Sequence, residues 1–339
     1  MLARCFYYAI KPLLPRPLRI ELRRLRARMM HTVVRGAWPI LETAGRTPEG
    51  WPGWPEGRQF AVVLTHDVEG SKGLAGCLQL AELEARLGFR SAFYFVPEGE
   101  YRVPKELRDQ LAASGFEVGV HDLRHDGKLY RSRKVFQRSA GQINHYLKDW
   151  KVVGFRSGFM HHNLDWLRDL NVLYDASTFD TDPFEPQPDG ANTIFPFRVA
   201  DLDGHGYVEL PYTLVQDFTL FVVLKEPSIN VWKQKLEWIA SQGGMALLDV
   251  HPDYMAFGDA APNRHEYHAA LYEEFLEWVK QEYEGRYWHA LPREIATFYK
   301  QAVSRDAKPI PPQSSAFRRL AGSSSEAQTG RFPDPTTRA

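Results

Sequence analysis

The feature that most constrains the fold is a repeated alternation of strand-like and helix-like patterns between residues 58 and 303. Most short apolar runs are followed by a stretch with a helical pattern, whereas residues 177–205 read as irregular. The predicted helices lie at residues 74–89, 104–115, 132–149, 163–170, 229–242, 267–283 and 292–302. The predicted strands lie at residues 60–66, 91–96, 116–121, 152–156, 172–177, 207–212, 245–251 and 286–291. Seven or eight such units in one stretch predict an α/β fold, a (β/α) barrel of about seven strands. An open doubly wound sheet is the alternative.

The segments that flank this barrel region, 58–303, differ from it in composition. Residues 1–47 form a basic N-terminal arm, and residues 48–57, PEGWPGWPEG, read as a Pro/Gly/Trp linker. Residues 304–339 are rich in Ser, Pro and Gly, which predicts a disordered tail.

A helix is predicted over about residues 18–30 of the arm, because apolar residues recur there at helical spacing with arginines between them. These are Leu18, Leu22, Leu25 and Met29. Residues 1–35 contain nine Lys or Arg and one acid, Glu21, so they carry +8 and the rest of the neutral chain carries −8. Two interpretations stay open. The arm binds the inner membrane face or a partner, or it packs on the barrel with a solvated basic face.

Composition excludes several classes of protein. Lys+Arg and Asp+Glu both number 42, which argues against a dedicated nucleic-acid-binding protein. Two cysteines, Cys5 and Cys77, are too few for a disulfide framework or a cysteine-rich zinc site. No apolar run approaches the roughly 20 residues of a membrane span, and CFYYAI is too short for a secretory signal. We therefore expect a cytoplasmic protein, peripheral to the inner membrane if the arm binds it; homo-oligomerisation stays open.

Polar residues gather at the predicted carboxyl ends of the strands. They are Asp67, Glu69, His121, His125, Arg156, Asp175, His251 and Asp253. The active site of a parallel barrel forms at this end, so we expect these side chains to converge. Each alone has a simpler interpretation, as a helix cap, a salt-bridge partner or a chance His-x-x-x-His. Asp67 and Glu69 point to one side of a continuing strand, whereas His66 and Val68 point away.

These residue types suit one kind of chemistry. Two neutral imidazoles and a carboxylate can bind a zinc-like divalent ion and leave positions open for water and substrate. Such an ion polarises a carbonyl group and acidifies bound water. A second carboxylate can accept the proton of the water, and a histidine opposite can protonate the leaving nitrogen. The strand-end cluster therefore predicts a metal-dependent hydrolase.

Four motifs resemble, in order, those of the polysaccharide deacetylase family, carbohydrate esterase family 4. They are THDVEG (65–70), HDLRH (121–125), GFRSGF (154–159) and LLDVHPD (247–253). The resemblance covers about residues 58–300. It implies a distorted (β/α) barrel that removes N- or O-acetyl groups from glycans with an Asp-His-His metal site. Two departures stand out. The usual metal-binding aspartate falls on Val68, and Ser157 and Gly158 follow the arginine where the family has Arg-x-Pro.

The stretches HDVE, YDASTFDTDPF, VELP and VHPD look more like an atypical branch of that family. This branch contains intracellular peptidoglycan-deacetylase-like, allantoinase-like and cyclic-imidase-like proteins, in which an Asp-x-Asp pair replaces adjacent aspartates. The resemblance implies one divalent ion, zinc or cobalt, held by three residues, Glu69, His121 and His125. It also implies that Asp67 accepts the proton, that Arg156 holds Asp67 ionised and that His251 is the general acid.

Candidate substrate-binding residues follow the fourth and fifth strands. Asp175 ends the fifth strand, and Asp180 and Asp182 lie in the loop STFDTDPFEP (177–186), where they could accept hydrogen bonds from sugar hydroxyls. His161 follows Arg156 closely and could line the pocket. The simpler interpretations are a solvated acidic loop and a helix cap.

The sequence therefore predicts a metal-dependent hydrolase that removes an acetyl group from an N- or O-acetylated sugar or glycan precursor. One alternative is an amidohydrolase acting on a small amide or cyclic imide. A third hypothesis, prompted by Val68, is a catalytically inactive barrel that binds carbohydrate.

Overall fold

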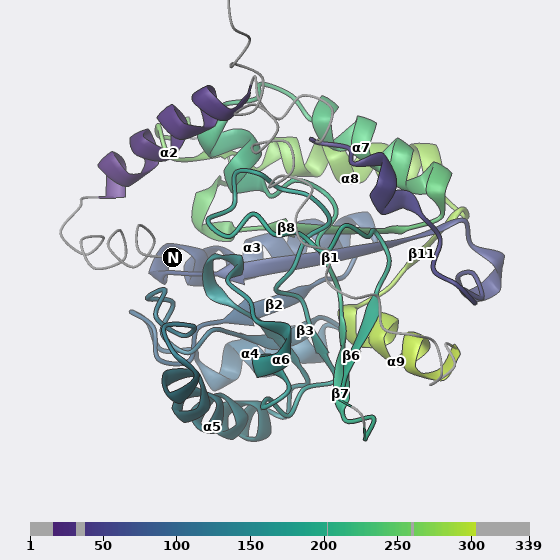
Figure 1. The fold of residues 1–339 in the computed structure, drawn as a ribbon. Coiled ribbons are helices and arrows are strands. Elements are labelled where there is room, and N and C mark those ends of the chain that lie inside the picture. Colours follow the sequence, from purple (N-terminus) through teal and green to yellow (C-terminus); the bar gives the residue numbers. More distant parts are fainter. Residues whose placement is uncertain (1–15, 32–37, 202, 259–260, 303–339) are drawn as a thin grey trace, which may run out of the picture.

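A computed structural model describes residues 16–31, 38–201, 203–258 and 261–302. The predicted tail at 304–339 lies outside the described residues, as do residues 1–15 and 32–37 of the basic arm. The described chain folds around one curled, mostly parallel sheet with helices on its outside (Figure 1).

The parallel strands occupy the predicted positions and form the distorted barrel. In the described chain their order is β8-β1-β2-β3-β4-β5-β7. Their bounds are β1 Phe60–Val68, β2 Ala92–Phe95, β3 Glu117–His121, β4 Gly154–Arg156, β5 Tyr174–Asp175, β7 Gly206–Glu209 and β8 Met245–Val250. The eighth predicted strand, β11 Tyr287–His289, pairs with the first residues of β1. Three strands of the described chain were not predicted. β6 Phe197–Ala200 runs antiparallel to β7 inside a stretch that reads as irregular. β9 Met255–Ala256 and β10 Tyr267–His268 pair in a separate two-stranded sheet.

The barrel is distorted because, among the described residues, β7 and β8 do not pair directly. A loop segment between them makes the hydrogen bonds to β8 instead. The amides of Thr213 and Leu214 donate to the carbonyl oxygen of Leu247 at 3.0 and 3.1 Å. The amide of Leu247 donates back to the Thr213 hydroxyl at 3.0 Å. These bonds close the sheet at its seam and hold β8, which carries part of the site, beside the loop that follows β7.

The predicted helices are confirmed, and they cover the outside of the sheet. In Figure 1, α7 and α8 lie above it and α4, α5 and α6 below it. The bounds are α3 Ser71–Leu87, α4 Lys105–Ala113, α5 Arg133–Trp150, α6 Leu164–Leu167, α7 Asn230–Gln242, α8 Ala270–Tyr283 and α9 Pro292–Ala302. Local signals set their ends. The Ser132 hydroxyl caps α5 by accepting from the amide of Val135, and Gly88 and Gly243 end α3 and α7 at φ 85° and 72°.

Strand β1 shows how the fold aims side chains at the site. All nine of its residues are buried. Phe60, Val62 and Leu64 pack in the cluster beneath the helices, whereas Ala61 and Val63 pack in the barrel interior. Continuing this alternation, Asp67 belongs to the interior face of the strand. The period of the strand thus delivers a carboxylate to the carboxyl end of the barrel.

Residues on the amino side of β1 lie on the barrel. In the predicted linker, Trp54 is buried and its indole N–H donates to the carbonyl oxygen of Gly243 at 2.8 Å. The predicted arm helix is present as α2, Arg16–His31. Within the described ranges, no helix is long and apolar enough to cross a bilayer.

Candidate active site

The end of β1 presents two carboxylates toward the pocket and turns its other side chains away. Val68 is fully buried in the core beneath the helices. His66 is also fully buried, and its Nε2 lies 2.8 Å from Glu84 on α3. Val68, where the family aspartate would fall, is therefore a core residue. Asp67 and Glu69 remain as the carboxylates that this strand contributes to the site.

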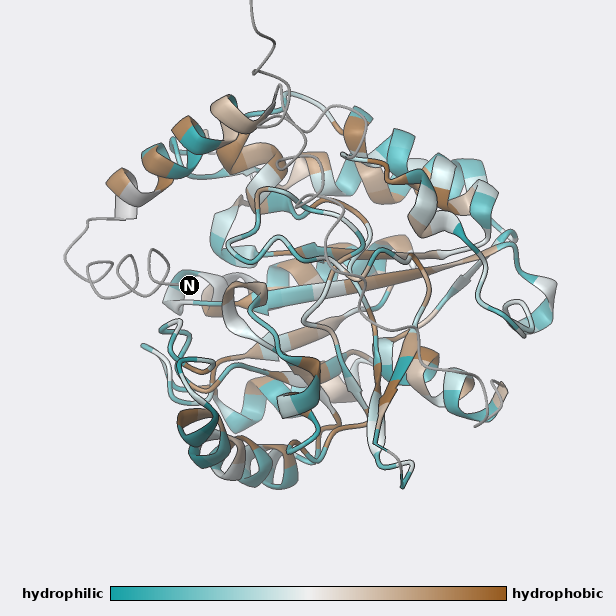
Figure 2. Ribbon diagram, in the orientation of Figure 1, coloured by the Kyte–Doolittle hydropathy of each residue, from teal (hydrophilic) through white to brown (hydrophobic). Residues whose placement is uncertain are grey.

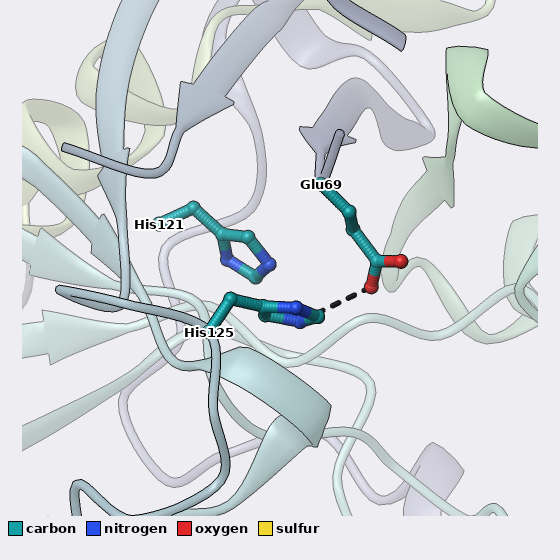
Figure 3. Close-up of side chains that lie close together, drawn as sticks. All are labelled: Glu69, His121 and His125. Atoms are coloured by element: carbon teal, nitrogen blue, oxygen red, sulfur yellow. Dashed lines mark ion pairs between the residues drawn. The ribbon is translucent and has the colours of Figure 1, made fainter. Parts of the chain in front are cut away.

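Glu69, His121 and His125 lie together, with one potential ligand atom from each within 4.8 Å of the others (Figure 3). The Oε1 atom of Glu69 lies 3.1 Å from Nε2 of His125. His121 ends β3, and Nδ1 of its ring donates to the carbonyl oxygen of Arg156 at 3.1 Å. That bond leaves the lone pair on Nε2, a buried atom with no hydrogen-bond partner among the described residues. A neutral imidazole with Nδ1 bonded to a carbonyl has the arrangement that metal-binding histidines use.

A second layer of residues fixes the two partly exposed members of this cluster. The Tyr254 hydroxyl donates to Oε2 of Glu69 at 2.9 Å, and the amide of Glu69 donates to Asp253 at 2.9 Å. His125 adopts a left-handed backbone conformation, with φ 51°. A Cβ on Gly158 would lie 2.6 Å from Cδ2 of His125. The glycine that stands where the family motif has proline therefore makes room for this histidine.

Asp67 is held as a carboxylate. Its Oδ1 accepts from Nη1 of Arg156 at 3.1 Å, and its Oδ2 lies 3.6 Å from Nε2 of His121. Burial alone would raise the pKa of Asp67, but the positive charges of His121, when its ring is protonated, and of Arg156 outweigh burial, so the pKa is lowered. For Glu69 too, burial would raise the pKa, and His125 lowers it well below the ordinary value. Both carboxylates are thus ionised at neutral pH.

Arg156 is completely buried and donates hydrogen bonds to two carboxylates. One of them, Asp249, was not predicted from the sequence. The same Nη1 that contacts Asp67 also donates to Asp249, on β8. Burial, with the repulsion of Asp67, raises the pKa of Asp249 to about 8 despite the arginine. One cation between two buried carboxylates thus keeps the pKa of Asp67 low, whereas the pKa of Asp249 stays raised. A lone acid inside the apolar run MALLDV was the available signal.

His251 is oriented by a second missed residue, Asp217. The amide of His251 donates to Oδ2 of Asp217 at 2.8 Å, and Nδ1 lies 2.7 Å from Oδ1. The Tyr267 hydroxyl also donates to this carboxylate, at 3.0 Å. Burial alone would lower the pKa of His251, but Asp217 and then Asp249 raise it well above the ordinary value. The histidine is therefore an imidazolium with its Nδ1 engaged.

A pocket of about 270 Å³ opens over this cluster. Asp67, Glu69, His125 and His251 all line it. Its outer wall includes Ile20 and Arg23 of α2, so the arm helix forms part of the pocket rim. His121 and Arg156 lie behind this lining and orient the residues that face the pocket.

The predicted substrate-binding residues are buried with partners of their own, and in the described chain the pocket lining does not include them. They are Asp175, Asp180, Asp182 and His161. Asp175 accepts from Ser177, Asp180 pairs with Lys235 of α7 at 2.9 Å, and Asp182 accepts from the Tyr212 hydroxyl. Their substrate-binding role stays a prediction that the pocket geometry does not support. From the same loop, the unpredicted Glu185 lines the pocket instead.

The described chain contains other acid–histidine groups. Asp67, Asp249 and His251 are close enough to share an ion, but Arg156 and Asp217 already neutralise these groups. A third group, Asp201, Asp203 and His205, is exposed. The Glu69–His121–His125 cluster combines an orphaned ring nitrogen with access to the pocket, so it is the best candidate metal centre.

Comparison with known proteins supports the fold. No family model and no curated protein matches the chain. A candidate polysaccharide deacetylase from Mycobacterium smegmatis is similar in structure, with a TM-score of 0.59 at 19% identity over 76% of this chain and 96% of that one. A peptidoglycan deacetylase from Bacillus subtilis gives a TM-score of 0.42 at 15% identity, over 72% and 93% of the two chains. A family 4 pseudoenzyme from Bacillus anthracis gives 0.41 at 13%, over 70% and 65%. The resemblance to polysaccharide deacetylases is confirmed at the level of the fold by the first of these.

Proposed function

We propose that the chain is a metal-dependent hydrolase that removes an acetyl group from an N- or O-acetylated sugar or glycan precursor. One observation carries the proposal: three candidate metal ligands and two buried carboxylate–cation pairs lie together at one pocket. The residues are Glu69, His121 and His125, with the pairs Asp67–Arg156 and His251–Asp217. The polysaccharide deacetylase fold supports an acetyl substrate on a sugar.

Glu69, His121 and His125 would hold one divalent ion, with zinc or cobalt the best match to two imidazoles and a carboxylate. The orphaned Nε2 of His121 and the ionised Glu69 fit such an ion. When bound, it would act as a Lewis acid toward the acetyl carbonyl and lower the pKa of water. The longer Glu69 arm fits because Tyr254 and Asp253 hold its carboxylate and its backbone.

The protein's own groups supply the proton transfers. Asp67, kept ionised by Arg156, accepts the proton of the attacking water. His251 lies on the neighbouring strand end, because β8 pairs directly with β1. As an imidazolium oriented by Asp217, it donates a proton from Nε2 to the leaving nitrogen or oxygen. The two groups thus begin the reaction in the protonation states that hydrolysis needs.

The test compares His121→Ala with His145→Ala, a control that removes an exposed histidine on α5. Purified proteins are dialysed against zinc or cobalt, analysed for metal and assayed for acetate release from nucleotide-linked and lipid-linked N-acetyl sugars. We expect about one ion per chain in the wild type and the control, and a metal-free, inactive His121→Ala with an unchanged circular dichroism spectrum.

Three results would contradict the proposal. Full metal occupancy in His121→Ala would remove this cluster as the metal site. Ring opening of a cyclic imide without acetate release from any sugar would favour the amidohydrolase alternative. A wild-type protein that binds neither metal would favour a carbohydrate-binding barrel without catalysis.

A further inference from the structure

The arm helix α2 packs on the barrel, but the face that it buries is not the one formed by the apolar residues of the sequence pattern. Ile20 and Ala27 are buried, and the guanidinium of Arg23 lies over the ring of Phe218, 5.1 Å from its centroid. Arg24 donates twice to the carbonyl oxygen of Val222, at 3.1 and 3.0 Å. Both contacts are to the π-helix η5, Phe218–Val223. This inner face fixes α2 beside the pocket, which Ile20 and Arg23 line.

The outer face of α2 is an exposed apolar stripe. Its members are Leu18, Leu22, Leu25 and Met29, which are 46, 46, 53 and 63% exposed. Their spacing of four, three and four residues places them on one side of the helix. Figure 2 shows apolar residues recurring along α2 among hydrophilic ones. In the described ranges these four and Val153 are the exposed large hydrophobic side chains. The helix therefore packs on the barrel, but the leucines lie on its exposed side, together with Arg26 and Arg28.

Exposed apolar residues gathered in one stripe mark an interaction surface. The charge around the stripe selects its partner. Residues 1–35 carry +8, and Arg28 is exposed on the same helix. A second copy docked stripe to stripe would bring two +8 arms together, which like-charge repulsion opposes. An anionic lipid surface offers apolar acyl chains for the leucines and negative headgroups for the arginines.

We propose that α2 docks on an anionic lipid surface through the stripe Leu18, Leu22, Leu25 and Met29. Since the other face of the helix lines the pocket, docking brings the pocket rim close to the lipid headgroups. If the proposed deacetylase function holds, this position suits an acetylated sugar carried on a lipid. The docking itself is independent of that function, because it needs neither metal nor substrate.

The test measures binding of the full-length protein to vesicles of phosphatidylglycerol and phosphatidylcholine by co-sedimentation. The variant Leu22→Gln/Leu25→Gln removes apolar surface without changing charge, and Val153→Gln is the matched control at an exposed apolar residue outside α2. Point substitutions are preferable to deletion of the arm, because deletion would also remove Ile20 and Arg23 from the pocket. We expect binding by the wild type and the control at low salt, weakened by high salt, and about tenfold weaker binding by the double variant.

Three other outcomes overturn the docking proposal. Wild-type protein that ignores anionic vesicles at low salt has no such surface. Unchanged binding by the double variant places the contact elsewhere in the chain. A lipid-free wild type that is dimeric by light scattering, with a double variant that is monomeric, identifies a second copy as the occupant. Loss of acetate release without loss of vesicle binding would count against the proposed function alone.

Discussion

Two groups of carboxylates in this barrel, all buried except the partly buried Glu69, differ in the side chains that contact them. Asp67, Glu69 and Asp217 form a cation-paired group, each within 4.0 Å of an arginine or histidine nitrogen. Glu117, Asp175 and Glu209 form a hydroxyl-bonded group that accepts from Tyr174, Ser177 and Thr178 respectively. The residue types are the same, and all six lie on strands or directly after them except Asp217, which precedes the π-helix η5.

The partners decide the charge. In the cation-paired group, the pKa values of Asp67 and Glu69 are lowered in spite of burial. In the hydroxyl-bonded group, burial raises the pKa of Glu117 to about 7 and that of Glu209 well above its ordinary value. Asp67 and Glu69 therefore carry charge to the pocket, where they can accept protons or bind metal. The second group lies inside the barrel, where burial raises its pKa values and its hydrogen bonds hold strands together.

The sharpest test of this contrast is the pair Asp67→Asn and Asp175→Asn. Asp67→Asn removes the proton acceptor, so we expect kcat to fall by about 10²–10⁴-fold with metal content unchanged. Asp175→Asn keeps a hydrogen-bonding group that Ser177 can contact, so we expect kcat within about twofold of wild type. Acetate release under saturating substrate gives kcat for both. A near-normal kcat for Asp67→Asn would remove it from this role, and a large loss for Asp175→Asn would restore it as a substrate residue.

Glu117→Gln tests the hydroxyl-bonded group through stability. Glu117 accepts from the Tyr174 hydroxyl and the Arg293 amide, with Arg293 and Glu294 as the nearest charges. Its folded pKa of about 7 exceeds the ordinary 4.5, so between these values the unfolded chain releases a proton that the folded chain keeps. The free energy of unfolding therefore falls as pH rises through this window, by about 3 kcal/mol in all.

Urea unfolding at pH 5, 6, 7 and 8 measures this dependence. We expect Glu117→Gln to flatten the curve relative to wild type, whereas Glu106→Gln, at an exposed position on α4, should leave it unchanged. Parallel curves for Glu117→Gln and wild type would show that Glu117 ionises normally in the fold.

The same contrast explains what the sequence could predict. Strand and helix positions follow from apolar periodicity, and the strand ends then bring Asp67, Glu69, His121, His125 and the other predicted metal and proton-transfer residues together. The distant partners leave no such pattern. Asp217 precedes the run FTLFVV, which forms a π-helix, and it reaches His251 only in the folded chain.

Two further expectations failed for lack of tertiary information. The sequence suggests that Asp180 is part of a solvated loop. In the structure it is buried and paired with Lys235, 55 residues away on α7. In α2 the helical spacing of the apolar residues predicts correctly that they form a stripe. The spacing cannot predict which face of the helix is buried, because an arginine can pack inward by donating to backbone carbonyl oxygens. Arg24 does so at Val222, and the stripe turns outward.

Asp217→Asn weakens one cation pair without removing the catalytic group. Because Asp217 raises the pKa of His251, its neutralisation should lower that pKa and the protonated fraction of the histidine. We expect the alkaline limb of kcat to move to lower pH by about one unit, so that activity on this limb drops by up to about tenfold while activity at pH 6 changes less. A pH profile of kcat measures this. An unmoved alkaline limb, with metal content intact, would mean that His251 is not the general acid.

The smallest effect is expected from His205→Ala, in the exposed group of Asp201, Asp203 and His205. Water already solvates these side chains, and Asp201 is engaged by Arg168 at 3.4 Å and by the His205 amide at 2.8 Å. Exposed ion pairs of this kind contribute roughly 0–1 kcal/mol, and no orphaned ring nitrogen comparable to that of His121 is found on His205 in the described chain. Proximity of acids and a histidine is thus insufficient here; burial and a fixed tautomer are what the Glu69–His121–His125 cluster adds. Zinc content measured after dialysis should therefore remain at about one ion per chain in His205→Ala, with the melting temperature unchanged. A fall in zinc content would show that the exposed group binds metal and that the contrast between buried and exposed clusters fails.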